Sequence, residues 1–237
     1  MSAVENARTQ WGLSHLNARV TGFVYLSYFF TAILSASLLK GIIVSGDVAG
    51  TIRNVYTQEP LFHIGLAVGL ISVALYVALT ARLYELFKAV NQDVSLLAAF
   101  FSLIGCATQA FGTIFEAAPL ITKQSELGAF SQEQSQNITQ MFLRLHGQAM
   151  ELGFVFFGLY CVFIGYLILR STFLPRFLGV VLGIAGLGWL TFLLPSLART
   201  LSPYIQIAGI AAEALLMLWL LVFGIKVDRW AQQASTP

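Results

Sequence analysis

Long apolar runs alternate with short polar connections along most of the 237-residue chain. Each run holds about 20 residues, which is the length that a helix needs to cross roughly 30 Å of hydrocarbon. The pattern therefore predicts an all-α fold, a six-helix transmembrane bundle that forms one integral membrane domain over residues 1–237. The expected spans are 20–43, 61–82, 95–118, 147–169, 176–195 and 204–225.

The connections between these runs are too short to hold a separate soluble domain. The longest one, between residues 121 and 140, is polar and has room for a short interfacial helix. The fourth helix is expected to begin near Ile138, before its apolar span. Proline is expected only at span ends, so no span should be kinked by Pro60, Pro119, Pro175, Pro195 or Pro203.

Composition supports the membrane class. The chain is 57% hydrophobic and 10% charged, with a mean hydropathy of +0.78, whereas a soluble domain is roughly 25% charged. A soluble fold of this length could not bury so much apolar surface, so membrane lipids are the expected surroundings. The net charge of +2 is too small to suggest nucleic acid, and the sequence has no Lys/Arg-rich run, so no nucleic acid partner is expected.

The distribution of Lys and Arg predicts the orientation of the chain in the membrane. Eight of these residues fall on the side that holds both termini, and five fall on the other side. Because cations collect on the cytoplasmic side, we expect a multi-pass protein of the cytoplasmic membrane with both termini inside. Trp189, Tyr204 and Trp230 lie near span ends, where interfacial aromatic anchors are expected.

Small residues recur at helical spacing on several spans. In lipid such stripes let two helices approach closely, so packing within the bundle is their ordinary role. Contact with a second copy of the chain or with another membrane protein is the alternative. The stripes are Gly65, Gly69 and Ser72 on the second span and Gly179, Gly183 and Gly186 on the fifth, with Gly158 and Gly165 facing the fifth from the fourth.

Ionisable residues inside the spans are candidate site residues, because charge is costly in hydrocarbon. Glu116 ends the third span, Glu151 opens the fourth, and Glu213 lies deeper in the sixth. At 100° per residue, each acid falls on the face of its helix that carries small residues. We therefore expect all three acids to face neighbouring helices and to form a polar pocket near the outer face.

Other polar residues are expected around this pocket. The predicted ligand-binding set is Glu213, Glu151, His146, Arg144, Gln109 and Glu116. A purely structural network is the alternative, in which Arg144 balances Glu151 or Glu116 and Gln109 completes the hydrogen bonds.

No familiar catalytic or cofactor signature occurs in the chain. GxSxG, HExxH and Gly-rich phosphate loops are absent from the sequence, and Cys106 and Cys161 lack metal-binding spacing. We therefore predict no metal site, and the sequence leaves the cofactors and the catalytic residues unknown. His63 and His146 both lie near the outer boundary, so an intramembrane enzyme or redox protein with haem or a metal stays an alternative.

Motifs around the fourth and fifth spans resemble a known family. They are GFVFFG at 153–158, GY at 165–166, RS at 170–171, LPR at 174–176, LGV at 178–180 and AG at 185–186. Together with RVTG at 19–22, HG at 146–147 and WLL at 219–221, they resemble the bacterial integral membrane family filed as domain of unknown function 4386. The resemblance covers most of the chain and implies six membrane helices, but it implies no catalytic residue.

These features predict a membrane protein that binds or transports a small or amphipathic ligand, such as a lipid, a quinone or a solute. Glu213 would act as a proton-linked switch, because burial penalises the charged form of a carboxyl group. An accessory or structural subunit of a membrane complex is one alternative. The enzyme or redox protein that uses His63 and His146 is the other.

Overall fold

The structure is a computed structural model that describes the backbone of residues 3–122 and 131–235. Every regular element in these ranges is helical, so the predicted all-α fold is confirmed. Six helices are long and apolar enough to cross a membrane, which confirms the predicted bundle of six. These helices occupy Asn17–Lys40, Glu59–Phe87, Gln92–Ile121, Gln132–Arg170, Arg176–Leu193 and Thr200–Val222.

The elements follow one another with short connections. In chain order they are α1 (Ala3–Lys40), α2 (Val48–Thr57), α3 (Glu59–Phe87), α4 (Gln92–Glu116), α5 (Ala118–Ile121), α7 (Gln132–Arg170), α8 (Arg176–Trp189), the 3₁₀ helix η1 (Leu190–Leu193), α9 (Pro195–Val222) and α10 (Val227–Ala234).

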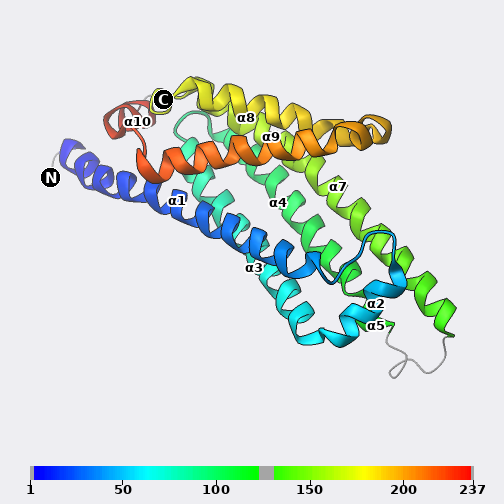
Figure 1. Cartoon of the computed structure of the whole chain (residues 1–237). Coiled ribbons are helices and arrows are strands. Elements are labelled where there is room, and N and C mark those ends of the chain that lie inside the picture. The colour runs from blue at the N-terminus through cyan, green and yellow to red at the C-terminus, as the bar shows by residue number, and fades with distance from the viewer. Residues whose placement is uncertain (1–2, 123–130, 236–237) are drawn as a thin grey trace. The chain divides into compact units, whose positions relative to one another are not determined.

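The chain forms two compact units, and α1, α3, α4 and α7 each contribute residues to both (Figure 1). The division into two units does not test whether residues 1–237 form a single domain, so the single domain stays a prediction. Unit 1 comprises Met1–Leu26, Tyr76–Gly105 and Phe154–Pro237, and unit 2 comprises Ser27–Leu75 and Cys106–Gly153.

Two helix starts differ from the sequence prediction. α7 begins at Gln132, earlier than the expected start near Ile138. α9 begins at Pro195 and contains Pro203, which was expected to precede the last span. Proline suits the first position of a helix, because that position needs no N–H donor. Pro203 removes one backbone hydrogen bond near the beginning of a 28-residue helix, and the remaining bonds keep the helix continuous.

The amphipathic helix α2 lies between the first two membrane helices, where the sequence predicted no helix. Asp47 caps its N-terminus by accepting a hydrogen bond from the backbone N–H of Gly50 at 2.7 Å. Val55 on its apolar face is fully buried with Phe62 and Ile42 in the core of unit 2. The short helix therefore packs against the C-terminal end of α1 and the N-terminal end of α3 within unit 2.

In unit 1, α7 and α8 approach closely through the predicted glycines. A Cβ atom added to Gly158 would lie 2.8 Å from the carbonyl oxygen of Gly186. A Cβ atom added to Gly165 would likewise lie 2.8 Å from the carbonyl oxygen of Gly179. Any side chain at these positions would push the helices apart, so the predicted glycine packing is confirmed. α8 in turn runs beside α9 (Figure 1).

Trp189 does not serve as the interfacial anchor that its position suggested. Its side chain is only 4% exposed, and its ring stacks on Phe154 with 4.7 Å between centroids. A Cβ atom added to Gly209 would lie 2.5 Å from the indole ring, so the glycine on α9 leaves the space that the ring fills. Tyr204, by contrast, is 72% exposed, as an anchor should be.

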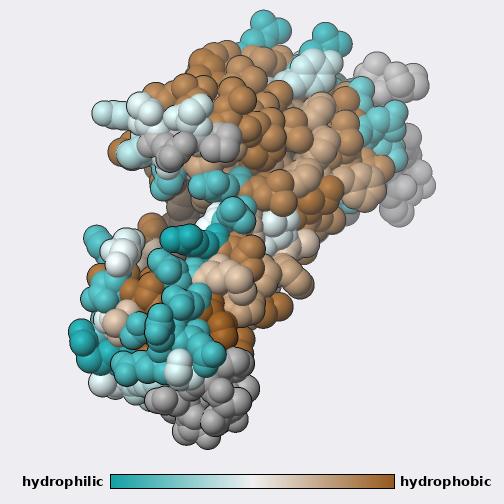
Figure 2. Space-filling view, turned by 90° about the vertical axis from the view of Figure 1, so that its right-hand side faces the viewer, coloured by the Kyte–Doolittle hydropathy of each residue, from teal (hydrophilic) through white to brown (hydrophobic). Residues whose placement is uncertain are grey.

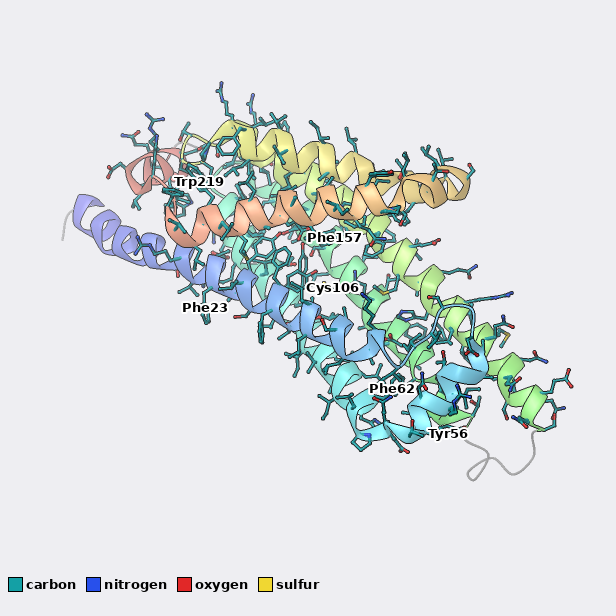
Figure 3. All side chains as sticks on the ribbon, in the orientation of Figure 1. Phe23, Tyr56, Phe62, Cys106, Phe157 and Trp219 are labelled. Carbon is teal, nitrogen blue, oxygen red and sulfur yellow. The ribbon has the colours of Figure 1, made fainter. Side chains whose placement is uncertain are left out.

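Large apolar side chains cover much of the outer surface. Phe23, Phe30 and Ile207 are each more than 60% exposed, and Phe23 projects outward from α1 (Figure 3). Hydrophobic residues form a broad surface on the face that Figure 2 shows. A soluble monomer rarely exposes so large an apolar patch. The surface therefore agrees with a multi-pass membrane protein whose helices face lipid.

Candidate functional site

Glu213 on α9 is the most deeply buried acid among the described residues, with only 5% of its surface exposed. Its Oε2 atom accepts a hydrogen bond from the hydroxyl group of Tyr25 at 2.8 Å. Gly22 makes this contact possible, because a Cβ atom there would lie 2.6 Å from the backbone nitrogen of Leu221. The close approach of α1 and α9 at Gly22 brings Tyr25, one helical turn further along, to the carboxylate.

Further polar groups of unit 1 surround this hydrogen bond. The ring of Tyr76 lies 6.4 Å from that of Tyr25 and 6.1 Å from that of Tyr160, both in edge-on contact. Tyr76 and Cys161 are also close enough to interact electrostatically with the Glu213 carboxylate. We call these five buried residues the Glu213 cluster: Glu213, Tyr25, Tyr76, Tyr160 and Cys161.

The Glu213 cluster contains a carboxyl group and no cationic side chain. The ion pairs among the described residues do not include Glu213. An ionised carboxylate buried without a compensating cation is costly in a low-dielectric interior. Glu213 can avoid that cost by holding a proton or by contacting a positively charged ligand. Tyrosine ring faces attract cations as well, so the cluster is suited to one positive charge.

A second polar group lies in unit 2, where His146 on α7 faces α4. Its Nδ1 atom lies 3.0 Å from the carbonyl oxygen of Gly112, so the Nδ1–H group is the donor. Its Nε2 atom lies 4.0 Å from Oε1 of Glu116. The side chains of His146 and Glu116 are 24% and 16% exposed. The pair therefore places a basic side chain next to an acidic one.

A shallow apolar groove lies beside His146, between α4 and α7 of unit 2. Its volume is about 520 Å³, which is within the usual range of small-ligand sites. Gln148 places one amide group in an otherwise mostly apolar lining. The groove is lined by Ala107, Thr108, Phe111, Leu145, Gln148, Ala149 and Leu152.

The other predicted site residues have different positions. Arg144 and Glu151 are exposed on α7, and Gln109 is half-buried on α4. The ion pairs among the described residues include neither Arg144 nor Glu151. The expected balance of Arg144 with Glu151 or Glu116 is therefore not formed.

Glu151 was expected to face a neighbouring helix, and this expectation was wrong. On the helical wheel Glu151 shares a face with Gly158 and Gly165, and that face packs against α8. The wheel does not show how far along α7 the neighbouring helix extends. α8 ends at Trp189, and the Cβ atom of that residue already lies beside Gly158. The glycine face of α7 therefore has α8 as its neighbour only from about Gly158 onward.

The six predicted residues belong to both units. Glu213 lies in unit 1, whereas Glu151, His146, Arg144, Gln109 and Glu116 lie in unit 2. Within unit 2, the side chain of His146 lies close to that of Glu116. A single pocket shared by all six residues stays a prediction.

Tyr25, Tyr76 and Tyr160 were not among the predicted site residues, because a tyrosine is uncharged at neutral pH and these three belong to no familiar motif. A usable signal was present in each of these residues. A tyrosine in the middle of an apolar span needs a hydrogen-bond partner, whereas a phenylalanine does not. A tyrosine that replaces phenylalanine deep in a span therefore indicates a nearby polar group.

The two histidines of the redox alternative have separate acidic neighbours. His63 Nε2 lies 3.8 Å from Oε1 of Glu59, one turn before it on α3, and the His63 side chain is 58% exposed. His146 contacts Glu116 and Gly112 instead. Among the residues that the structure describes, no group of three or more His, Cys, Asp or Glu side chains is placed to hold a metal ion.

Comparisons with known proteins agree with the resemblance seen in the motifs. The sequence model of the family described as "Domain of unknown function (DUF4386)" matches residues 20–224, a range that includes both polar groups. An uncharacterized protein of Archaeoglobus fulgidus is 24% identical over 174 residues, which is 70% of this chain and 85% of that protein. No solved structure matches the chain significantly.

Proposed function

The chain belongs to the family described as domain of unknown function 4386, and we propose that it binds and carries a small or amphipathic ligand in the membrane. Glu213 would couple this binding to a proton. One observation carries the proposal: Glu213 is buried and accepts a hydrogen bond from Tyr25, yet the ion pairs of the described residues provide it with no cation.

The composition of the Glu213 cluster favours a ligand with a positively charged head. A carboxylate compensates one positive charge, and tyrosine rings stabilise a cation through their faces. A cationic ligand would replace the proton of Glu213, so that one proton leaves for each ligand bound. The apolar body of such a ligand would match the apolar helices around the cluster.

Binding at Glu213 requires the cluster to open. Tyr25 on α1 is 1% exposed, and Glu213 on α9 is 5% exposed. A ligand therefore reaches the carboxyl group only when α1 and α9 separate and the bond between Tyr25 and Glu213 breaks. Such an alternation between closed and open helix pairs is the ordinary basis of membrane transport.

The groove beside His146 supports an amphipathic ligand in particular. Its lining is mostly apolar with one amide group, so a chain or ring with a single polar end would suit it. The distribution of Lys and Arg favours a cytoplasmic membrane with both termini inside, so this groove would lie toward the outer face.

The proposal is tested on protein in nanodiscs with tetraphenylphosphonium as a lipophilic cation probe. We expect binding measured by calorimetry to release up to one proton per probe molecule, which appears as a dependence of the heat on the buffer. Glu213→Gln should weaken binding at least tenfold, because the amide can neither lose a proton nor balance a cation.

Glu85→Gln is the matched control, because Glu85 is an exposed acid in the last turn of α3 and pairs with Lys88 at 2.6 Å. This variant should bind the probe as the wild type does. Wild-type protein that fails to bind the probe, or a Glu213→Gln variant that binds it unchanged, would contradict the proposal. Native mass spectrometry of the same preparations identifies any ligand that copurifies.

A further inference from the structure

Unit 1 contains a large cavity where two turns of the chain meet. Its volume is about 1250 Å³, which exceeds that of most small-ligand sites. One wall is the turn between α7 and α8, residues 171–176, and the other runs from the end of α9 into α10, residues 219–232. Neither wall includes a residue of the Glu213 cluster.

The cavity combines a cationic rim with an aromatic wall. Arg176, Lys226 and Arg229 line it together with one acid, Asp228, so three positive charges face one negative charge. Trp219 lies at the end of α9 next to α10 (Figure 3). Its ring contacts that of Phe223 with 4.6 Å between centroids. A cationic rim beside an apolar wall is complementary to an amphiphile with an anionic head.

In the part of the chain that the structure describes, the three cations are not engaged in ion pairs. The ion pairs among the described residues include none of Arg176, Lys226 and Arg229. The guanidinium group of Arg229 instead donates a long hydrogen bond of 3.5 Å to the carbonyl oxygen of Thr172. All three side chains are exposed, so their donors remain accessible to an anion.

Backbone contacts hold the two walls together. Gly224 has a φ of +66°, a conformation that favours glycine, and it turns the chain from α9 toward α10. Two residues later, the N–H group of Lys226 donates to the carbonyl oxygen of Phe173 at 3.2 Å. This bond ties the second turn to the first. The cationic rim is therefore built on a fixed backbone.

Side-chain bonds from α10 extend this connection. The N–H group of Thr172 donates to Oε1 of Gln233 at 3.0 Å, and Nε2 of Gln233 donates to the carbonyl oxygen of Arg170 at 3.2 Å. The indole N–H of Trp230 donates to the carbonyl oxygen of Leu86 at 3.0 Å. These bonds fix α10 against unit 1, so the cavity is formed before any ligand binds.

The cavity lies where three of the helices long enough to cross a membrane begin or end. α7 ends at Arg170, α8 begins at Arg176, and α9 ends at Val222. The positive-inside rule predicts that this end faces the cytoplasm, where anionic lipids give the membrane surface a negative potential. Phe177 and Phe223 are 47% and 62% exposed, so the aromatic wall continues outward to the lipid-facing surface.

We propose that this cavity binds the phosphate group of an anionic phospholipid, with Arg176, Lys226 and Arg229 around the phosphate and the acyl chains along Trp219 and Phe223. Arginine and lysine are the side chains that bind phosphate oxygens most strongly. The exposed aromatic wall favours a lipid over a soluble phosphate ester, because a soluble ester would leave that wall without an apolar partner.

Native mass spectrometry from mixed micelles tests the site, with phosphatidylglycerol and phosphatidylcholine as competing probes. We expect wild-type protein to retain phosphatidylglycerol preferentially. In the double variant Arg176→Gln/Lys226→Gln, the preference for phosphatidylglycerol over phosphatidylcholine should be at least tenfold lower. The control is Lys40→Gln/Arg53→Gln, which removes the same charge from two exposed cations of unit 2 and should keep the preference. Equal retention by the two double variants would overturn the proposal.

Two further measurements separate a lipid from a soluble phosphate ester. Glycerol phosphate at millimolar concentration should not displace phosphatidylglycerol, and full displacement would overturn the assignment to a lipid. Phosphatidylglycerol with brominated chains should quench tryptophan fluorescence more than brominated phosphatidylcholine does. This difference should be smaller in Trp219→Phe, and an undiminished difference would exclude the acyl chains from the aromatic wall.

Discussion

Glu213 in unit 1 and Glu116 in unit 2 are both acids within apolar helices, yet they have different partners. Glu213 accepts a hydrogen bond from the hydroxyl group of Tyr25, whereas Glu116 lies 4.0 Å from an imidazole nitrogen of His146. A tyrosine hydroxyl supplies a hydrogen bond without a charge, whereas an imidazole is a basic group. Among the ion-pair contacts of the described residues, Glu116 thus has a basic neighbour and Glu213 has none.

This difference indicates what each acid can do. Glu116 can be balanced from within the protein, so its contact with His146 can serve the packing of α4 against α7. Glu213 depends on a proton or on a cation from outside for its balance. The more deeply buried of the two acids is therefore the better candidate for a ligand-coupled role.

The largest expected loss of stability comes from substituting a glycine at a close helix contact near each acid. Gly22→Val should lower the free energy of unfolding by about 3 kcal/mol, because a Cβ atom at Gly22 meets the backbone of α9 at 2.6 Å. Gly112→Ala should cost less, about 1 kcal/mol, because its nearest neighbour is the Cβ atom of Ala149 at 3.3 Å. Unfolding in detergent mixtures, followed by circular dichroism, measures both.

Gly41→Ala is the control for these two substitutions, because a Cβ atom at Gly41 meets nothing within 4 Å. Its stability should match that of the wild type. A Gly22→Val variant as stable as the control would show that α1 and α9 need not approach closely for the fold.

The next largest effect is expected for Tyr25→Phe. The substitution leaves the buried Glu213 carboxyl without this donor and should cost about 2 kcal/mol of stability. Tyr204→Phe removes the same hydroxyl group from a side chain that is 72% exposed, and it should be nearly neutral. Equal losses in the two variants would argue against the bond between Tyr25 and Glu213.

A smaller effect is expected for His146, since its side chain is partly accessible. His146→Leu should cost about 1 kcal/mol, because it removes the donor to Gly112 and the neighbour of Glu116. His146→Asn can still donate to the carbonyl oxygen and should recover part of this loss. Chemical denaturation compares the two variants, and His63→Gln, at an exposed histidine, is the control.

The smallest effect is expected for Glu151→Gln and Arg144→Gln. Both side chains are exposed, and neither belongs to an ion pair among the described residues, so each change should alter stability by less than about 0.5 kcal/mol. The same denaturation experiment measures them. A loss above about 1 kcal/mol for Glu151→Gln would reveal a stabilising contact that its exposed position does not suggest.

Much of the fold followed from the sequence alone. The length of each apolar run set the number of membrane helices, since a helix needs a definite number of residues to cross hydrocarbon. Glycine spacing also predicted the approach of α7 to α8 at Gly158 and Gly165, because only a bare backbone permits contact at that distance.

Only the tertiary structure decided which side chains meet the buried acids. A helical wheel gives the direction of a residue about its own axis, but not the neighbour it meets or where that neighbour ends. For this reason Glu151 was misplaced, and Trp189 was taken for an interfacial anchor. Tyr25 and Glu213 are 188 positions apart in the chain, and their hydrogen bond exists because Gly22 lets α1 reach α9.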